Sequence, residues 1–247
     1  MSRHYELLQR AAQEQALKSD ASPLNEGPTD GPLPSLGPRS TPRQELLKLV
    51  HRLFLFGQSS GPRVIVFTGV GRHVGCSAVC AGAAEALAGQ VADPICVVDA
   101  NFRWPSLHKY FRSDNLRGLA DALVKPGAIR SFAHRIRGGN LWLLSAGTVT
   151  ASAGTLLSSQ NLSLRIAELR EEFRFILIDS SPVNENTDAI LLGQLAEGVL
   201  LVLESNSTRR EVARRAKESF ESAEVSVVGA VLNKRNFPIP AFLYERV

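Results

Sequence analysis

Short apolar segments alternate with amphipathic stretches along most of the chain. Apolar runs that read as buried strands cover residues 63–68, 95–100, 141–146, 174–180, 198–204 and 225–233. Helical spacing of apolar residues covers 76–90, 105–112, 117–124, 160–172, 187–196 and 208–222. Strands that are apolar on both faces and are separated by helices favour a mostly parallel sheet covered on both sides. We therefore predict an α/β fold for this part of the chain.

The N-terminal region has a different pattern. Residues 3–18 place apolar side chains at helical spacing, whereas residues 19–42 are rich in Pro, Gly, Ser and Thr. Such a segment buries too little apolar surface to offset its ordering entropy, so we expect a flexible linker. A second amphipathic helix is expected near residues 43–56. The predicted organisation is a leader helix (1–18), a disordered linker (19–42) and one domain (43–247).

Composition narrows the possible classes of protein. The net charge is +4 and the pI is near 9.2, but no basic stripe is visible, so we do not expect nucleic-acid binding. Three cysteines without a CxxC pair suggest reduced thiols. The start of the chain is too polar for a secretory signal, and no apolar run approaches the ~20 residues of a membrane span. We expect a soluble cytoplasmic protein.

The stretch GVGRHVGCS, residues 69–77, lies between a predicted strand and a predicted helix. It partly matches the pattern GxxxxGK(S/T), in which backbone N–H groups and a helix N-terminus bind phosphates. Gly75 and Ser77 occupy their usual places, but Cys76 stands where lysine is expected and Val70 takes the first glycine slot. An ordinary strand-to-helix turn is the alternative. The predicted phosphate-binding residues are Gly71, Arg72, His73, Val74, Gly75, Cys76 and Ser77.

Two strands end on a carboxylate, namely Asp99 and Asp179. The carboxyl ends of parallel strands face the crevice where open α/β sheets bind ligands. Singly, each aspartate is more often a turn or cap residue. Together with the loop they favour a nucleotide site, with Mg²⁺ held by Ser77, Asp99 and Asp179.

At this point the chain resembles the cytosolic domain of the bacterial tyrosine kinases (BY-kinases) of capsule and exopolysaccharide machinery, in the MinD/ParA-like branch of the P-loop superfamily. The resemblance covers roughly residues 43–235 and rests on VVDANFRWPSLHKYF, GLADAL, LWLLSAG, FILIDSSPV and VVGAVLN. It implies that Arg103 belongs to the second acidic motif and that Asp188 lies in the element after Asp179. It also implies that the nucleotide is ATP, that Asp99 and Asp179 are the catalytic residues and that Asn233 reads the adenine edge.

The resemblance implies partners as well. BY-kinases act with a membrane polysaccharide co-polymerase or export protein, so a peripheral location at the inner membrane through that partner is expected. Their subunit-contact helix carries E-x-x-R-x-x-R, which is only partly kept here as Glu45, Lys48 and His51. Homo-oligomers through helix 43–56 are therefore a prediction. The tyrosine-rich tail of the family is missing, and residues 236–247 contain a single tyrosine, Tyr244.

The differences from the family's motifs affect the expected phosphoryl-transfer activity. Loss of the loop lysine removes an interaction that, net of desolvation, we put at roughly 2–4 kcal/mol. The second aspartate of the acidic motif is Asn101. We expect nucleotide binding to survive with lower affinity and phosphoryl transfer to be slowed or lost. Rescue by Arg72, His73 or Arg63 is conceivable.

Other readings stay open. One alternative is a non-catalytic regulatory subunit of a membrane polysaccharide assembly. A Min- or Par-type positioning ATPase is disfavoured, because the additional loop lysine of that class would fall at Gly71.

Cys76 at a helix N-terminus could have a lowered pKa and act as a nucleophile, although a small side chain that fills the loop is the simpler interpretation. Cys80, one turn later, is not expected to form a disulfide with it.

Overall fold

The computed structural model describes residues 42–55, 61–148, 152–157 and 160–235. The predicted leader helix, Tyr244 and the predicted linker lie outside these residues, except for the last linker residue, Pro42, which begins a helix. The strands are β1 (Val64–Gly69), β2 (Ile95–Asp99), β3 (His134–Arg135), β4 (Leu141–Leu144), β5 (Phe175–Asp179), β6 (Gly198–Glu204) and β7 (Val227–Asn233). The helical elements are α2 (Pro42–Val50), η1 (His51–Leu55), α3 (Cys76–Ala88), α4 (Leu107–Tyr110), α5 (Leu119–Val124), η2 (Ile129–Phe132), α6 (Ala153–Leu157), α7 (Gln160–Glu172), α8 (Asp188–Gly193) and α9 (Arg210–Ser222).

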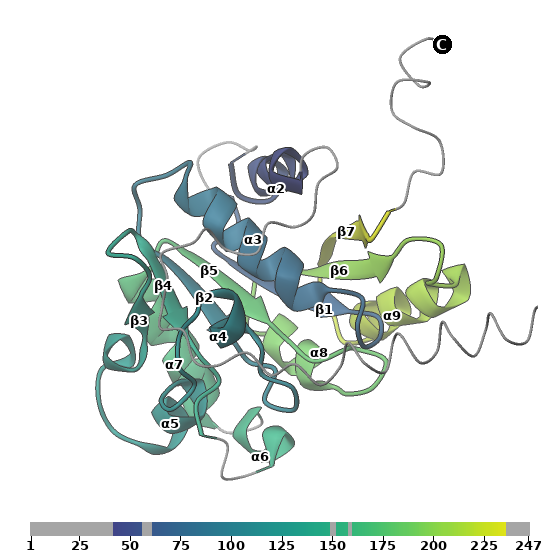
Figure 1. Cartoon of the computed structure of the whole chain (residues 1–247). Coiled ribbons are helices and arrows are strands. Elements are labelled where there is room, and N and C mark those ends of the chain that lie inside the picture. Colours follow the sequence, from purple (N-terminus) through teal and green to yellow (C-terminus); the bar gives the residue numbers. More distant parts are fainter. Residues whose placement is uncertain (1–41, 56–60, 149–151, 158–159, 236–247) are drawn as a thin grey trace, which may run out of the picture. The chain divides into compact units, whose positions relative to one another are not determined.

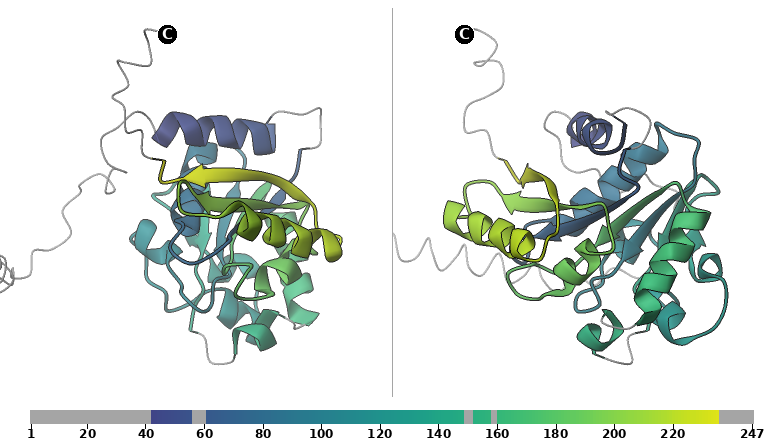
Figure 2. Two further views of the ribbon diagram at one scale, coloured as in Figure 1. Left: turned by 90° about the vertical axis from the view of Figure 1, so that its right-hand side faces the viewer. Right: turned by 180° about the vertical axis from the view of Figure 1, so that it is seen from behind.

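The strands form one seven-stranded sheet in the order β3-β4-β2-β5-β1-β6-β7. All neighbouring pairs are parallel except β3 with β4. Figures 1 and 2 show α2 and α3 on one side of the sheet and α7, α8 and α9 on the other. The predicted α/β fold, with a mostly parallel sheet covered on both faces, is confirmed.

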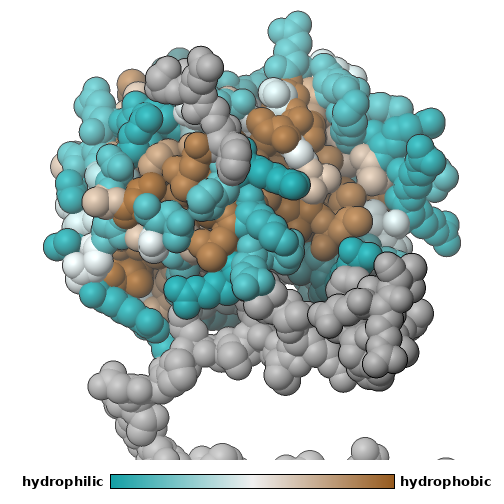
Figure 3. Space-filling view, turned by 90° about the horizontal axis from the view of Figure 1, so that it is seen from above, coloured by the Kyte–Doolittle hydropathy of each residue, from teal (hydrophilic) through white to brown (hydrophobic). Residues whose placement is uncertain are grey.

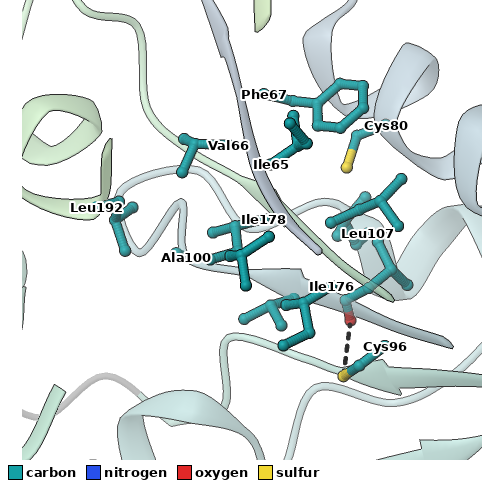
Figure 4. Packing of buried hydrophobic residues seen from close by; sticks show 14 of the residues in the cluster. Ile65, Val66, Phe67, Cys80, Cys96, Ala100, Leu107, Ile176, Ile178 and Leu192 are labelled. Atoms are coloured by element: carbon teal, nitrogen blue, oxygen red, sulfur yellow. Dashed lines mark hydrogen bonds between the residues drawn. The ribbon is translucent and has the colours of Figure 1, made fainter. Parts of the chain in front are cut away.

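The core lies where the central strands meet these helices. Every residue of β1, β2 and β5 is buried, which requires apolar side chains on both faces of the strands. Figure 4 shows how successive residues of β1 point to opposite layers: Phe67 lies towards Cys80 of α3, whereas Val66 lies towards Leu192 of α8. Both faces of the sheet are therefore sealed by helix side chains.

The helix predicted near 43–56 is present as α2 followed by η1, a π-helical turn. Phe54 is buried and meets the Phe175 ring edge-on, with ring centroids 5.6 Å apart. Leu46 packs on α3 at Gly82, where a Cβ would lie 2.7 Å from Leu46 Cδ1. This glycine lets α2 approach α3 closely. Figure 3 looks onto the α2 side and shows separate apolar patches among polar side chains.

All six predicted strands are present, with ends shifted by one or two residues. The sheet edge at β7 departs from the expected pattern, because its residues alternate between half-buried and exposed. Three short elements were not predicted: the two-residue strand β3, the 3-10 turn η2 and the five-residue helix α6. None of them carries a residue of the predicted site.

Candidate phosphate-loop site

The loop between β1 and α3 has the geometry of an anion-binding turn. Gly75 adopts a left-handed conformation, with φ 86°, at the N-cap of the 13-residue helix α3, and no side chain caps this helix. The N–H groups of the first helical turn have no acceptor within the helix, and the helix dipole makes this end positive. A side chain at Gly75 would be strained by this φ, and its Cβ would lie 2.3 Å from Asn233 Nδ2, which would have to move.

The predicted hydroxyl and carboxylates meet at this loop. Ser77 Oγ donates a hydrogen bond of 2.5 Å to Asp179 Oδ2. Asp99 and Asp179 are register partners at the carboxyl ends of the adjacent strands β2 and β5. Both carboxylates are fully buried. The fold therefore brings together the three residues that the sequence singled out for Mg²⁺.

Asp99 has a structural task that the sequence did not specify. Its Oδ1 accepts a hydrogen bond from the Asn101 N–H at 3.2 Å, and its Oδ2 accepts from the N–H groups of Ser106 and Leu107, both at 2.9 Å. The last two amides open helix α4. Asp99 thus fixes the conformation of the segment after β2 by accepting hydrogen bonds from its N–H groups, as a capping carboxylate does.

The two carboxylates influence each other's protonation. Burial raises the pKa of Asp179 to about 8, and the neighbouring charge of Asp99 adds to this, while the Ser77 hydroxyl acts in the opposite direction. Burial also raises the pKa of Asp99 to about 6 against the lowering effect of its three N–H donors. Because the groups interact, they titrate as a pair, and Asp179 is the one that retains a proton near neutral pH.

Cys76 begins α3 beside these carboxylates. Burial and the Asp179 charge raise the pKa of its thiol well above the ordinary value. The helix N-terminus alone would lower this pKa, so burial and the Asp179 charge oppose the activation that a nucleophilic thiol needs. Burial likewise raises the pKa of the Cys80 thiol. All three cysteines of the chain are free. Cys76 therefore presents a neutral side chain where the pattern expects an ammonium group.

A pocket of ≈ 500 Å³ opens over the loop. Its lining includes the loop residues together with seven residues that were not predicted to bind: Asn101, Trp104, Ser106, Tyr110, Ser180, Pro182 and Lys234. The Arg72 guanidinium stacks over the Trp104 ring, 4.0 Å from its centroid. Burial, then Asp179 and Cys76, raise the pKa of the Tyr110 phenol.

Sequence signals existed for three of these lining residues, Trp104, Tyr110 and Lys234. Trp104 and Tyr110 lie in the stretch NFRWPSLHKYF that follows Asp99, and Lys234 comes directly after Asn233. Residues that follow a strand carrying a candidate ligand are themselves candidates, because they leave the sheet at the same edge.

Asn233 contacts the loop itself. Its Nδ2 donates a hydrogen bond of 2.9 Å to the Val74 carbonyl, and the same atom lies against Gly75. Asn233 thus joins the end of β7 to the phosphate loop.

Arg103 and Asp188, which belong to two different motifs, form an ion pair. Arg103 Nε lies 3.3 Å from Asp188 Oδ2, and Ser181 Oγ donates to the same oxygen at 2.8 Å. The segments after β2 and after β5 are therefore joined by side chains beyond the two aspartates.

Arg63 is placed away from the loop. Its guanidinium donates to the carbonyls of Arg170, Phe173 and Arg174, around the start of β5, at the opposite edge of the sheet from the loop. Rescue of the missing charge by Arg63 is therefore excluded.

The partly kept residues of the contact motif lie on α2. Glu45 and Lys48 pair with each other at 2.8 Å on the surface, with side chains 69% and 65% exposed. His51 Nε2 lies 3.2 Å from Gln90 Oε1 at the end of α3.

The residues at the loop fit a hard divalent cation. Asp179 Oδ1 is buried and has no hydrogen-bond partner among the described residues, so one carboxylate oxygen is left for a ligand. Ser77 supplies a hydroxyl next to it. Oxygen donors of this kind suit Mg²⁺, which keeps several waters and takes few protein ligands. Within the described ranges no cluster of three or more His, Cys, Asp or Glu side chains could hold a metal on its own.

Comparison with known proteins gives a consistent result. No protein-family model matches the chain. Tyrosine-protein kinase YwqD of Bacillus subtilis is 28% identical over 139 residues, which cover 56% of this chain and 59% of YwqD. The putative tyrosine-protein kinase EpsB of Ralstonia nicotianae is 33% identical over 78% of this chain and 26% of EpsB. The chain thus spans less than two thirds of the length of either relative.

Solved structures agree with the sequence relatives. The BceF tyrosine kinase domain superposes with a TM-score of 0.70 and 27% identity, over 92% of this chain and 88% of that domain. The septum site-determining protein MinD of Pyrococcus horikoshii, complexed with Mg-ADP, has a TM-score of 0.59 and 19% identity over 74% of this chain and 76% of MinD, and it shares the fold. Among the described residues, none of the helices has both the length and the apolar character that crossing a bilayer requires.

Proposed function

We propose that this chain is a P-loop protein of the bacterial tyrosine kinase (BY-kinase) type, as its similarity to these relatives and solved domains supports, and that it binds ATP with Mg²⁺. The site comprises the loop 69–77, Asp179 and Asp99. The observation that carries this proposal is the meeting of Ser77 Oγ and Asp179 Oδ2 beneath the uncapped N-terminus of α3, with Asp99 on the next strand. The nucleotide-binding domain comprises residues from 43 onward.

Each part of the site has a distinct task in this proposal. The N–H groups of Gly75, Cys76 and Ser77 bind the phosphates, and Arg72 and His73 contribute charge at the rim. Ser77 and Asp179 would hold the magnesium ion, which would neutralise phosphate charge when bound. Asp179 would offer an ionised carboxylate and Ser77 its hydroxyl oxygen. Asp99 acts from the next strand, directly or through water.

In this proposal, Cys76 makes phosphoryl transfer slow. Its thiol is neutral and cannot stabilise charge that develops on the transferring phosphoryl group. A loss of about 3 kcal/mol in the transition state would slow transfer roughly 100-fold. We propose that transfer to a tyrosine hydroxyl, on Tyr244 or on a partner, is slow or lost, and that nucleotide binding is the function that persists.

We further propose that the chain works with a membrane protein of polysaccharide assembly. Support comes from relatives named tyrosine-protein kinases, EpsB among them, and from the exposed Glu45–Lys48 pair on α2. The contact is made by the α2 surface, either to that partner or to a second copy of this chain. This contact brings the chain to the inner membrane.

Calorimetric titration of the purified chain with MgATP and MgADP tests the binding proposal. We expect binding by the wild-type chain, and about tenfold or greater tightening in Cys76→Lys, because the restored ammonium meets phosphate oxygens in an otherwise complete loop. Cys80→Ala is the matched control, since Cys80 is also a buried thiol of α3 but lies one turn from the pocket; its affinity should stay within about twofold.

The wild-type chain and Cys76→Lys also test phosphoryl transfer. After incubation with MgATP, an anti-phosphotyrosine blot should show little or no signal for the wild-type chain and more for Cys76→Lys. Absence of nucleotide binding by both proteins would contradict the proposal and leave a non-catalytic scaffold that uses the fold alone.

A further inference from the structure

One cation at the pocket belongs to neither the loop nor any motif of the sequence. Lys234 lines the same pocket as residues 71–77, at the end of β7, and its side chain is 45% exposed. The other basic residues in the lining are Arg72 and His73. Arg72 is stacked on Trp104, which leaves Lys234 as the one ammonium group in the described lining of a pocket that lacks its usual lysine.

Lys234 is held beside the loop by its neighbour. Asn233 Nδ2 donates to the Val74 carbonyl at 2.9 Å and lies against Gly75, so the chain at position 233 is fixed to the loop. Lys234 itself has φ 55°, a left-handed conformation that residues other than glycine seldom adopt. Such a conformation persists where the surroundings impose it, and here it follows directly on the anchored Asn233.

The present partner of Lys234 is replaceable. Its Nζ lies 3.2 Å from Glu204 Oε1, in a pair whose side chains are 45% and 28% exposed. Partly solvated ion pairs are weak, and a single carboxylate competes poorly with the multiple charges of a triphosphate. Glu204 does not line the pocket. When the Lys234 ammonium group moves into the pocket, it therefore exchanges the single charge of Glu204 for the multiple charges of the phosphates.

We propose that Lys234 binds the phosphates of the nucleotide and supplies, from the end of β7, part of the charge that the loop lost at position 76. In the empty pocket Glu204 holds Lys234, and nucleotide binding transfers it to phosphate. Glu204 is thus a competitor that lowers affinity. The inference rests on the proposed function and adds a binding residue to it.

A double-mutant cycle tests this assignment. Affinities for MgATP, MgADP, tripolyphosphate and adenosine are measured by calorimetry at one ionic strength for the wild-type chain, Lys234→Gln, Glu204→Gln and the double variant. Lys217→Gln is the matched control, because Lys217 also pairs with a glutamate on the surface but lies on α9 outside the pocket lining.

Lys234→Gln should weaken MgATP and tripolyphosphate binding about tenfold, MgADP less, and adenosine by less than twofold. Glu204→Gln should strengthen MgATP binding a few-fold, and this gain should vanish in the double variant, since Glu204 acts through Lys234. Lys217→Gln should leave all affinities unchanged. Circular dichroism melts confirm that each variant is folded.

Two results overturn the assignment. Equal losses for adenosine and MgATP in Lys234→Gln would mean a contact with the base or ribose, and an unchanged MgATP affinity would mean no contact. Either result leaves the proposed function standing. If the wild-type chain binds neither nucleotides nor tripolyphosphate, the proposed function fails and this inference falls with it.

Discussion

The protonation state of Asp179 determines the chemistry of the site. It is buried at the tip of β5, receives the Ser77 hydroxyl on one oxygen and has no described partner on the other. An ionised carboxylate in this position is costly, and burial accordingly raises its pKa to about 8. The metal-free protein therefore keeps a proton there that a bound cation would displace.

This proton predicts a pH dependence of stability. The unfolded chain releases it near pH 3.8 and the folded chain near 8, so the folded state binds more protons between these values and loses stability as pH rises through them. One pKa unit is worth about 1.4 kcal/mol, and we expect the free energy of unfolding in EDTA to fall by at least that from pH 5.5 to 8.5. Asp179→Asn should flatten the curve, as measured by urea unfolding at each pH.

A second buried aspartate provides the control. Burial raises the pKa of Asp121, but hydrogen bonds from Lys125 and from the N–H groups of Thr148 and Gly118 outweigh this and lower it. Its contribution is present at neutral pH and is lost only in acid, so Asp121→Asn should leave the slope between pH 5.5 and 8.5 unchanged. A slope that survives in Asp179→Asn would show that another group is responsible.

Residue-level prediction from the sequence succeeded where a motif fixes both backbone and side chain. Ser77, Asp99 and Asp179 converge because each follows a strand of one parallel sheet, a consequence of the pattern alone. The pattern could not show that Asp99 is engaged by the N–H groups that open α4, or that Asn233 braces the loop. Those contacts depend on how two loops fold in space.

At the scale of elements, α2 and η1 are attached to the domain by a few large side chains. Phe54 is 5% exposed and meets Phe175 edge-on, while Val50 and Leu53 are buried beside it. The polar surface of α2 is left to carry the exposed Glu45–Lys48 pair. Attachment of this helix therefore depends on η1 more than on the charged motif.

Phe54→Ala should cost about 3 kcal/mol in the free energy of unfolding, since it removes a buried ring and leaves a cavity under η1. Leu164→Ala is the control, because Leu164 is 62% exposed on α7 and its loss should stay within about 0.5 kcal/mol. Urea unfolding with both variants measures the difference. Similar losses for the two would show that η1 is not an anchor.

Elements were predictable in proportion to their length and periodicity. The six longer strands and α3, α7 and α9 follow from apolar runs and helical spacing. β3, η2 and α6 have two, four and five residues, too few to show a period, and they exist because neighbouring elements supply their contacts. The π-helical form of η1 likewise has no local sequence signal.

At the scale of the molecule, the sheet separates two environments that each hold one tryptophan. Trp142 lies on β4 beside the edge strand, under Arg130 at 4.5 Å, and is half-buried. Trp104 lines the pocket beyond the carboxyl end of β2 and is stacked by Arg72 at 4.0 Å. The sequence contains no other tryptophan. Fluorescence can therefore distinguish binding at the pocket from a change that spreads through the sheet.

In Trp142→Phe, MgATP should shift the emission to shorter wavelength, because an occupied pocket excludes water from Trp104 and draws Arg72 towards phosphate. The shift should saturate at the calorimetric affinity. Trp104→Phe, which keeps only Trp142, should show no shift, since the rigid parallel sheet lies between that residue and the pocket. A nucleotide-dependent shift from Trp142 with none from Trp104 would place the binding event elsewhere, and the site at the phosphate loop would then have to be abandoned.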